Sequence, residues 1–295
     1  MKIGFLKASE DQFSVDVMNK LKDFHLEMLS YSEVKLPLEP ELKVVVDRFS
    51  YGDEFLTEIM KSISMAGVYV INNPFAASAA NKIVDATLCD RLGIPRPKTY
   101  VLPEIRNDTD NEGSVAEPDL DKVIKSIDLP CILKPYGGFG WEHVYVVNSI
   151  SDLKNLYNAL KADHVMLAQE KIDYHHYYRA FCIGKNEVLL MKHIPRPFVR
   201  SEFLKTDLKE ITETKDDIIE WTKKLNAALD FDFNTVEWAI DINGKPFIID
   251  AFNEVPEVNR AIPESYYNWI VEKFAELIRQ KANSGEKNRM IFPQE

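Results

Sequence analysis

Apolar residues in the N-terminal third of the chain alternate between the spacing of buried strands and that of amphipathic helices. A helix is predicted to begin at a capping pair formed by Ser9 and Gln12 and to continue through Met28. Phe55 and Ile63 mark a second helix. Strands that alternate with helices predict a small parallel α/β sheet. The short apolar runs that predict its buried strands are residues 2–6, 44–46 and 68–71.

The middle of the chain predicts one long helix followed by a strand-rich region. The helix is expected from about Ala76 to Leu92, because Gly93 suits the position after a helix end and two prolines follow. The acidic stretch Glu104–Asp121 lacks large apolar residues and is predicted to be a mobile surface insertion. Strands are expected at 100–102, 131–135, 144–147, 166–170, 178–183 and 187–193, and helices at 123–127 and 151–161.

The C-terminal third predicts a helix, a hairpin and a second helix. Residues 194–211 are basic and contain prolines, so we expect them to be irregular. A capped helix is predicted over Thr214–Leu229 and a final amphipathic helix over Glu264–Lys281. The tail from Asn283 onward is expected to fray.

The composition is that of a globular protein, and its charge limits the kinds of partner that we expect. Of the 295 residues, 45% are hydrophobic and 28% charged, and the net charge is −11. A negative chain is a poor general binder of nucleic acid or of an anionic membrane, so neither partner is expected. We find no apolar run of membrane-spanning length and no signal-peptide pattern at the start. Three widely separated cysteines match no metal spacing or disulfide framework, which favours a cytoplasmic protein.

A glycine-rich turn after a predicted strand is the first candidate binding feature. Lys134 lies on that strand, and Gly137, Gly138 and Gly140 follow it within six residues. Glycine lets backbone N–H groups approach and cradle an anion, and the lysine adds a positive charge. A plain hairpin turn would explain the glycines equally well, and the spacing fits neither the P-loop nor the dinucleotide pattern.

A pair of acids on the C-terminal hairpin is the second candidate. A two-residue turn at Asn243–Gly244 would place Glu237 directly opposite Asp250 in a closely spaced pair. Two facing carboxylates favour a divalent cation such as Mg²⁺, to which Asn253 can add an oxygen. A protonated acid or a solvated pair is the alternative. The apolar residues expected on the opposite face are Trp238, Ile240, Phe247 and Ile249.

Basic residues gather in one further stretch of this acidic chain. They are Lys192, His193, Arg196 and Arg200. Such a run is usually solvated or paired with acids, but beside a Mg²⁺–phosphate site it would neutralise a phosphoryl group during transfer.

The order of these motifs resembles the ATP-grasp superfamily, which includes D-alanine–D-alanine ligase, glutathione synthetase and the ribosomal-protein glutamate ligases. The resemblance spans roughly Asn73 to Glu257. It implies an α/β plus α+β chain, in which an ATP-grasp fold follows a small N-terminal α/β domain. The implied parts are an N-terminal domain at 1–75, a linker helix with the small lid subdomain at 76–170, and a C-terminal subdomain at 171–295.

The resemblance also implies a role for each matching position, with ATP and Mg²⁺ as the bound groups. The residues implied to bind the nucleotide are Lys82, Lys134, Gly137, Gly138, Gly140, Glu170, Lys171, Ile172 and Asp173. The implied metal ligands are Glu237, Asp250 and Asn253, and the implied catalytic residues are Arg179, Lys192 and Arg196.

Two positions depart from the superfamily pattern. Tyr177 stands where an acid usually holds the ribose, and Asp173 is the candidate replacement. Asp250 and Asn253 are three residues apart rather than two, so we expect a bulge or strand end at Ala251–Phe252. The residues Glu257 and Asn259 have the usual spacing but lie beyond Pro256, and we rank them second.

The implied activity is an ATP-dependent ligase that joins a small carboxylate to an amine or thiol through an acylphosphate, with release of ADP and phosphate. A small-molecule kinase of the polyol or inositol-phosphate type and a non-catalytic nucleotide-binding module are the alternatives. We expect the substrate to bind where the N-terminal domain meets the cleft. The sequence is also compatible with a homo-oligomer.

Overall fold

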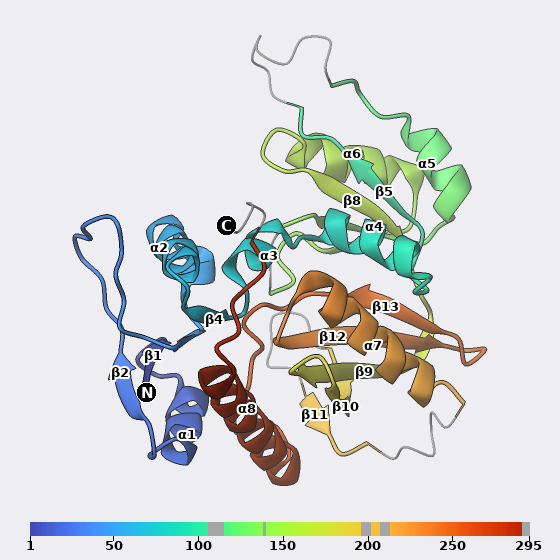
Figure 1. Ribbon diagram of the computed structural model, residues 1–295. Coiled ribbons are helices and arrows are strands. Elements are labelled where there is room, and N and C mark those ends of the chain that lie inside the picture. Colours follow the sequence, from blue (N-terminus) through green and yellow to red (C-terminus); the bar gives the residue numbers. More distant parts are fainter. Residues whose placement is uncertain (106–114, 138–139, 196–201, 207–212, 291–295) are drawn as a thin grey trace.

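Three β-sheets organise the computed structural model, which describes residues 1–105, 115–137, 140–195, 202–206 and 213–290 (Figure 1). One sheet lies in the N-terminal part, a small one stands above the rest in Figure 1, and the largest lies below it. Half of the predicted surface insertion, residues 106–114, lies outside the described residues.

The N-terminal sheet is parallel, as predicted, with the order β2-β1-β3-β4. Its strands are β1 (Lys2–Leu6), β2 (His25–Met28), β3 (Val44–Asp47) and β4 (Tyr69–Ile71). Helix α2 (Glu54–Met65) covers one face, whereas α1 (Gln12–Lys20) and the C-terminal α8 (Glu264–Ser284) cover the other. Because both faces are covered, Val44, Val45 and Val46 are all buried, and the strand is a continuous apolar run.

The first predicted helix is wrong at both ends. It starts at Gln12 with Asp11 as its N-cap, and Ser9 bonds to its neighbour Glu10 instead of closing a capping box. It ends at Lys20, and the segment expected to continue it forms β2. The apolar spacing there also suits a strand, and pairing with β1 decides between the two.

The small sheet is antiparallel, with the order β5-β8-β6-β7. Its strands are β5 (Thr99–Leu102), β6 (Cys131–Pro135), β7 (Tyr145–Val147) and β8 (Met166–Glu170), and α5 (Leu120–Ile127) and α6 (Ile150–Leu160) pack on it. These elements lie within a few residues of their predicted bounds.

Two short helices lead into the small sheet, where a single helix was predicted. They are α3 (Pro74–Ala79) and α4 (Lys82–Leu92). Ala80 and Asn81 between them are extended, and the Asn81 side chain accepts hydrogen bonds from two N–H groups at the start of α4. Gly93 follows α4 in the left-handed conformation (φ 67°), as predicted.

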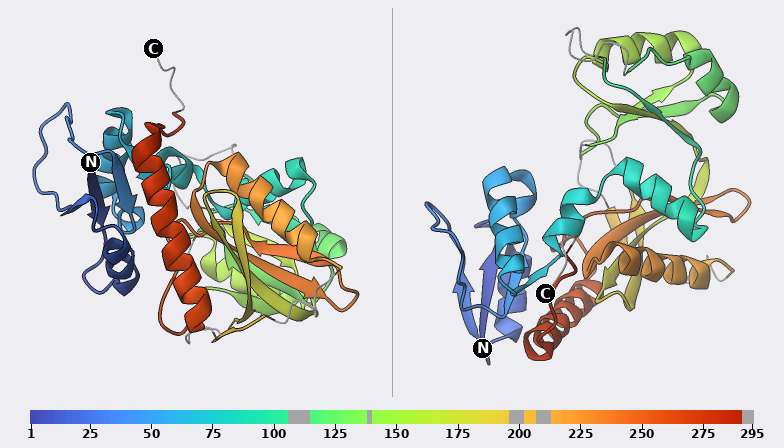
Figure 2. Two further views of the ribbon diagram at one scale, coloured as in Figure 1. Left: turned by 60° about the horizontal axis from the view of Figure 1, so that its bottom comes forward. Right: turned by 45° about the horizontal axis from the view of Figure 1, so that its top comes forward.

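The largest sheet is antiparallel, with the order β11-β10-β9-β12-β13. Its strands are β9 (Tyr174–Ile183), β10 (Glu187–Ile194), β11 (Glu202–Leu204), β12 (Phe233–Asp241) and β13 (Pro246–Asp250). Strand β11 lies in the region that was predicted to be irregular. Helix α7 (Lys215–Leu229) and α4 pack on one face, and α8 lies between the other face and the N-terminal sheet (Figure 2).

The hairpin of β12 and β13 keeps the predicted pair but not the predicted turn. The N–H of Gly244 bonds to the carbonyl of Asp241, and Asp241 pairs with Lys245, so three residues rather than two form the loop. Pairs near the loop are therefore shifted by one, and Trp238 lies opposite Ile248. The ladder then shifts again, with Ile249 as the extra residue.

This shift corrects the apolar face of the hairpin. Ile248 packs with Trp238 and Ile240 in the core under α7, whereas Phe247 and Ile249 were predicted there. We expected either a bulge or a strand end at Ala251–Phe252. The bulge lies earlier, at Ile249, whereas the strand does end at Asp250, just before these residues.

Buried polar side chains connect the N-terminal sheet to the largest sheet. The Asn72 amide donates to the carbonyls of Phe233 and Glu254 and accepts from the N–H groups of Asp232 and Phe233. Tyr69 donates to the Asp232 carboxylate. These bonds hold the end of β4 against the start of β12.

The C-terminal tail is ordered beyond the point where fraying was predicted. Helix α8 continues to Ser284, and Asn288 is 2% exposed. Its amide bonds to both backbone groups of Val70. Among the described residues, none of the helices is both long and apolar enough to cross a bilayer.

Candidate functional site

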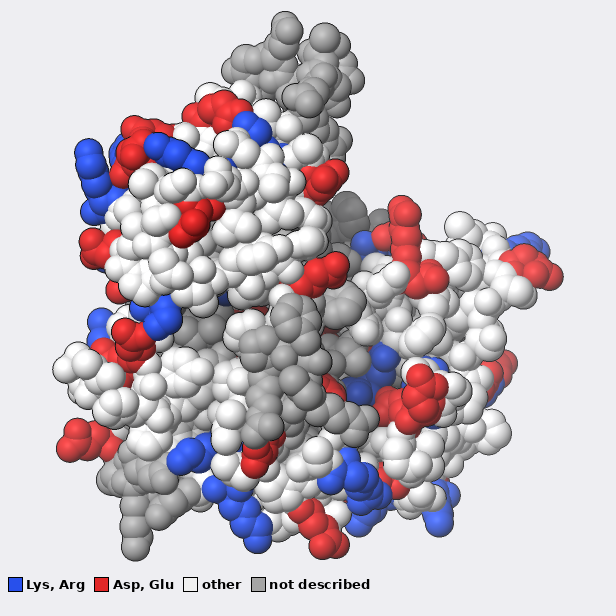
Figure 3. Space-filling model, turned by 180° about the vertical axis from the view of Figure 1, so that it is seen from behind, with Lys and Arg blue, Asp and Glu red and all other residues white. Residues whose placement is uncertain are grey.

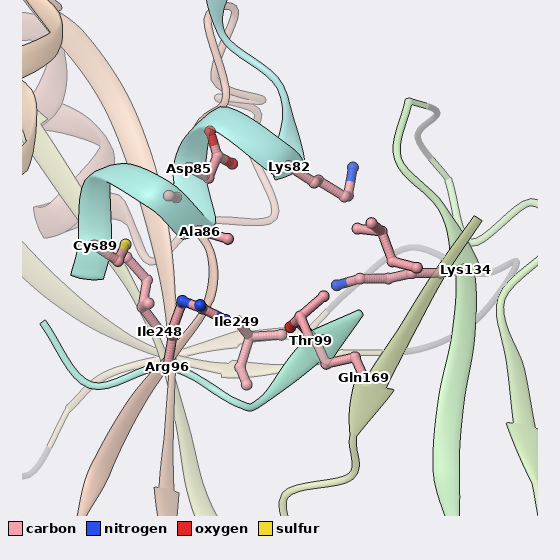
Figure 4. Close-up of a pocket in the computed structure, with 12 residues that line it drawn as sticks. Lys82, Asp85, Ala86, Cys89, Arg96, Thr99, Lys134, Gln169, Ile248 and Ile249 are labelled. Carbon is pink, nitrogen blue, oxygen red and sulfur yellow. The ribbon is translucent and has the colours of Figure 1, made fainter. Parts of the chain in front are cut away.

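A pocket lies between helix α4, the small sheet and strand β13 (Figure 4). It encloses about 340 Å³ of space, part of it open to solvent. Its lining residues include Lys82, Asp85, Arg96, Lys134, Gln169 and Ile249. Seen from behind, the molecule is hollowed beside the small sheet, and basic and acidic side chains are interspersed over the described surface (Figure 3).

Lys134 extends from β6 toward α4 and is 9% exposed (Figure 4). Burial lowers the pKa of its ammonium group, and Lys82 acts in the same direction, whereas the carboxylates of Asp250 and Glu237 raise it. The other predicted nucleotide lysine and the two predicted metal acids therefore all act on Lys134 electrostatically, although the four residues come from four different elements.

Asp85 is a pocket residue that the sequence analysis missed. It lies one turn after Lys82 on α4 and is 7% exposed. Burial, together with the charge of Asp250, raises its pKa to about 9 against the effect of the two lysines. Its Oδ1 atom has no hydrogen-bond partner in the described structure. An acid three residues after a lysine is common on exposed helices, so only its burial distinguishes it.

Glu237 and Asp250 lie opposite each other across β12 and β13, as predicted. Glu237 also forms an ion pair with Arg179, its neighbour on β9, and accepts a hydrogen bond from the Tyr177 hydroxyl. Burial is the largest single influence and would raise the pKa of Glu237. The charges of Arg179 and His193 and the hydrogen bonds from Tyr177 and Arg179 together outweigh it, and the pKa falls to about 2. Glu237 is therefore ionised at neutral pH, and Arg179 is engaged with it.

Asn253, the third predicted metal ligand, lies just beyond β13. Its N–H donates to the side-chain oxygen of Asn234 at 2.7 Å. The second-ranked residues, Glu257 and Asn259, bond to each other at the surface. No group of three or more His, Cys, Asp and Glu side chains among the described residues is arranged as a metal site. A metal here would be held by two carboxylates and an amide.

The predicted hinge connects the small sheet to the largest sheet. Glu170 ends β8, and both its N–H and its carboxylate bond to the backbone of Lys98. Ile172 lies between Lys171 and Asp173, which form an ion pair with each other. Tyr177, in the position of the expected ribose acid, is buried and points to Glu237.

The glycine-rich segment forms the connection between β6 and β7. Gly140 has a φ of 70°, which favours glycine, whereas Gly138 and Phe139 lie outside the described residues. A Cβ atom on Gly137 would meet no other atom within 4 Å. Trp141 is 39% exposed, so much of its ring is not packed under the small sheet.

The predicted basic cluster is divided by the strand register. Lys192 lies opposite Tyr178, on the face covered by α7, and neighbours along a strand point to opposite faces. His193 instead lies beside Tyr177, with ring centroids 5.7 Å apart, on the face of Glu237. Arg196 and Arg200 lie outside the described residues.

Comparison with known proteins gives matches in structure. No protein-family model matches the chain, and no curated protein matches it significantly. D-alanine–D-alanine ligase from Bacillus anthracis, solved with ATP, matches with a TM-score of 0.67 at 14% identity over 96% of this chain and 97% of the ligase. The chain has the ATP-grasp fold.

Two further ATP-grasp ligases match over similar lengths. One is the RiPP-associated enzyme of Chryseobacterium gregarium, in complex with ADP and a leader and core peptide, with a TM-score of 0.65 at 17% identity over 98% of this chain and 99% of that one. The other is PsnB, complexed with a minimal precursor, Mg and ADP, with a TM-score of 0.66 at 12% identity over 95% and 98%. At these identities the likeness concerns the ATP-grasp fold alone.

Proposed function

We propose that the protein is an ATP-dependent ligase that activates a carboxylic acid as an acylphosphate and joins it to an amine or a thiol. The observation that carries this proposal is the buried Lys134, on which Lys82 and the facing acids Glu237 and Asp250 all act. Cations for phosphates and acids for a metal thus meet where the small sheet adjoins the largest one. The ATP-grasp ligases that match the fold support the same reaction class.

The residues present fit both ATP and Mg²⁺. Lys82 and Lys134 would hold phosphate oxygens, and Glu170 to Asp173 would contact the nucleoside. Glu237, Asp250 and Asn253 offer the hard oxygen ligands that Mg²⁺ prefers. The ion would neutralise phosphate charge when bound.

The remaining groups would position the reactants and exclude water. Gly137, Gly138 and Gly140 would let the loop approach the phosphates closely. Arg179 would orient the substrate carboxylate, and Arg196 would stabilise the transferring phosphoryl group. Lys192 is left out of this role because it lies on the face of the sheet opposite to Glu237. The carboxylate oxygen attacks the γ-phosphorus and ADP leaves; the amine or thiol then attacks the acyl carbon and phosphate leaves. No enzyme nucleophile is needed.

Product analysis separates this reaction from the two alternatives. A kinase would make a stable phosphorylated product, and a nucleotide-binding module would release no phosphate. A ligase would release phosphate only when both the acid and the acceptor are present.

A hydroxylamine screen tests the proposal. Pools of carboxylic acids, including peptides with Asp and Glu side chains, are incubated with the protein, ATP and Mg²⁺, and hydroxamates are detected by mass spectrometry. We expect a hydroxamate and ADP with the wild type and with Lys125→Ala, an exposed lysine of α5. We expect neither with Lys134→Ala.

Two results would overturn the mechanism. One is acid-dependent ADP formation without any hydroxamate, and the other is the appearance of AMP and pyrophosphate. Equal binding of ATP by the wild type and by Lys134→Ala in calorimetry would show that the proposed nucleotide site is assigned wrongly.

A further inference from the structure

Tyr177 contacts the acid pair of the candidate metal site without being one of its predicted ligands. It is 7% exposed, and its hydroxyl donates a hydrogen bond to Oε2 of Glu237. The strand register explains this contact, because Arg179 on β9 lies directly opposite Glu237 on β12, and Tyr177 is two residues before Arg179. Residues two apart on a strand share a face, so the long Tyr177 side chain reaches Glu237 along the diagonal.

Two other rings pack against the ring of Tyr177. The imidazole of His193 on β10 lies 5.7 Å away, and the ring of Tyr174 on β9 lies 5.2 Å away, both measured between ring centroids. Contacts at these distances restrict movement of the ring. Burial and the charge of Glu237 raise the pKa of the Tyr177 hydroxyl well above its ordinary value. The hydroxyl therefore remains protonated and is held in place as a donor.

Both oxygen atoms of the Glu237 carboxylate are engaged from β9. Oε1 accepts from Nη2 of Arg179, and Oε2 accepts from Tyr177. An ionised carboxylate has about four lone-pair sites, so each oxygen can still bind a second group. Strands β9 and β13 flank β12 on opposite sides, and Asp250 lies opposite Glu237 on β13. The donors on β9 thus leave lone pairs of Glu237 available on the side of Asp250.

We propose that Tyr177 is a positioning residue for the divalent cation, whose hydroxyl orients the Glu237 carboxylate toward the side of Asp250. The inference rests on the proposed function, which assigns the metal to these acids. Arg179 balances the charge of Glu237, whereas the neutral hydroxyl contributes orientation without charge. Groups that hydrogen-bond to a metal ligand fix its orientation, and their loss typically weakens metal binding about 10–100-fold.

Tyr177→Phe tests this role, because it removes the hydroxyl and keeps the ring. Mn²⁺ serves as the probe, since water-proton relaxation increases when this paramagnetic ion is held on a slowly tumbling protein. In the presence of ADP, we expect Tyr177→Phe to bind Mn²⁺ at least about tenfold more weakly than the wild type. Binding of ADP without metal, measured by calorimetry, should be the same for both proteins.

Tyr157→Phe is the matched control. It also removes one tyrosine hydroxyl, which donates to the carbonyl of Pro103 at 2.7 Å, but Tyr157 lies on α6 against the small sheet. This variant should bind Mn²⁺ like the wild type.

Excess Mg²⁺ separates positioning of the metal ligand from damage to the fold. In the hydroxamate assay, Tyr177→Phe should need about tenfold more Mg²⁺ for its half-maximal rate. At saturating Mg²⁺ its rate should approach that of the wild type, because the fold and the nucleotide site are unchanged.

Equal Mn²⁺ binding by the wild type and Tyr177→Phe would overturn the inference and leave the proposed ligase in place. Equal weakening in Tyr157→Phe would also overturn it, because the loss would then come from general destabilisation. If Tyr177→Phe alone weakens Mn²⁺ binding but the wild type forms no hydroxamate, the positioning role remains and the proposed ligase fails. A wild type that holds no Mn²⁺ beside ADP would overturn both.

Discussion

Glu237 faces Asp250 across the largest sheet because an extra residue, Ile249, interrupts the ladder of β12 and β13. Nearer the loop, Trp238 lies opposite Ile248, and this register continued without a shift would set Glu237 opposite Ile249. The irregularity restores the acid pair at the end of the strand. Bulges are frequent next to active sites, where they redirect a side chain. Here the bulge brings two like charges together, and Arg179 compensates the charge of Glu237.

Removal of one of these charges should weaken ligand binding without lowering the stability of the free protein. In Asp250→Asn we expect the melting temperature without ligand to change little, since the charge of Asp250 opposes ionisation of Asp85 and Glu254 but supports the buried ammonium group of Lys134. The Mg²⁺-dependent part of ATP binding should weaken at least about tenfold, because the amide is a poorer ligand for a hard cation. Calorimetry with and without Mg²⁺ and a thermal melt measure both effects.

The exposed acid Glu272 gives the control for this experiment, because it lies on α8 far from the pocket in sequence and pairs with Lys20. Glu272→Gln should change neither quantity. A variant Asp250→Asn that binds ATP with undiminished Mg²⁺ dependence would contradict the metal assignment.

The ion pair of Arg179 and Glu237 should show strong energetic coupling. Both side chains are largely buried, at 11% and 19% exposed. Arg179→Met or Glu237→Gln alone leaves a buried charge or a buried polar group without its partner, and each should lower the free energy of unfolding by about 3–5 kcal/mol. The double variant should lose clearly less than the sum. Urea denaturation of the four proteins measures this, and additivity within about 0.5 kcal/mol would exclude the coupling.

Asp85 should make the protein less stable as the pH rises. Its pKa is about 9 in the folded chain against an ordinary value of 3.8, so between these values the folded state retains a proton that the unfolded state has released. The free energy of unfolding therefore falls with pH over this range. Asp85→Asn removes the effect and should be more stable than the wild type at pH 8 by about 1–3 kcal/mol.

Urea denaturation at several pH values between 5 and 9 checks this prediction. The advantage of Asp85→Asn should grow with pH. Parallel curves for the wild type and the variant would show that Asp85 is already ionised in the folded protein. Asp90→Asn, at an exposed acid of the same helix, controls for charge on α4.

The sequence predicts most of the fold because its elements carry strong local signals. The apolar run of β3, the glycine after α4 and the buried faces of α2 and α8 depend on neighbours along the chain. The strand β2 does not, since its residues also fit helical spacing and only pairing with β1 selects the strand. The division of α3 from α4 similarly depends on the extended Asn81.

The candidate site is harder to predict from the sequence than the fold, because its chemistry depends on burial and on contacts between distant segments. Lys134 and the acid pair were recognisable from strand and turn signals. Asp85 was not, because a carboxylate on a helix is usually solvated and only the folded arrangement of distant segments buries it. The pairing of Arg179 with Glu237 depends on β9 and β12 being neighbours in the sheet, which no local sequence pattern predicts.

Asn288 should be the most sensitive position of the C-terminal tail. Strand β4 lies at the edge of its sheet, so the backbone of Val70 has no strand on that side. The Asn288 amide replaces one: its oxygen accepts from the Val70 N–H at 2.8 Å and from the Ser64 hydroxyl at 3.0 Å, and its nitrogen donates to the Val70 carbonyl at 2.9 Å.

Asn288→Ala leaves these three buried groups unpaired, and we expect it to lower the free energy of unfolding by about 2–4 kcal/mol, since one such group costs about 1–3 kcal/mol. Asn288→Asp keeps the acceptor but loses the donor to Val70, so it should also destabilise the fold. Asn283→Ala removes an exposed amide of the same tail and should cost less than about 0.5 kcal/mol. Urea denaturation compares the four proteins. Equal stability of the two alanine variants would mean that the tail does not hold β4 in solution.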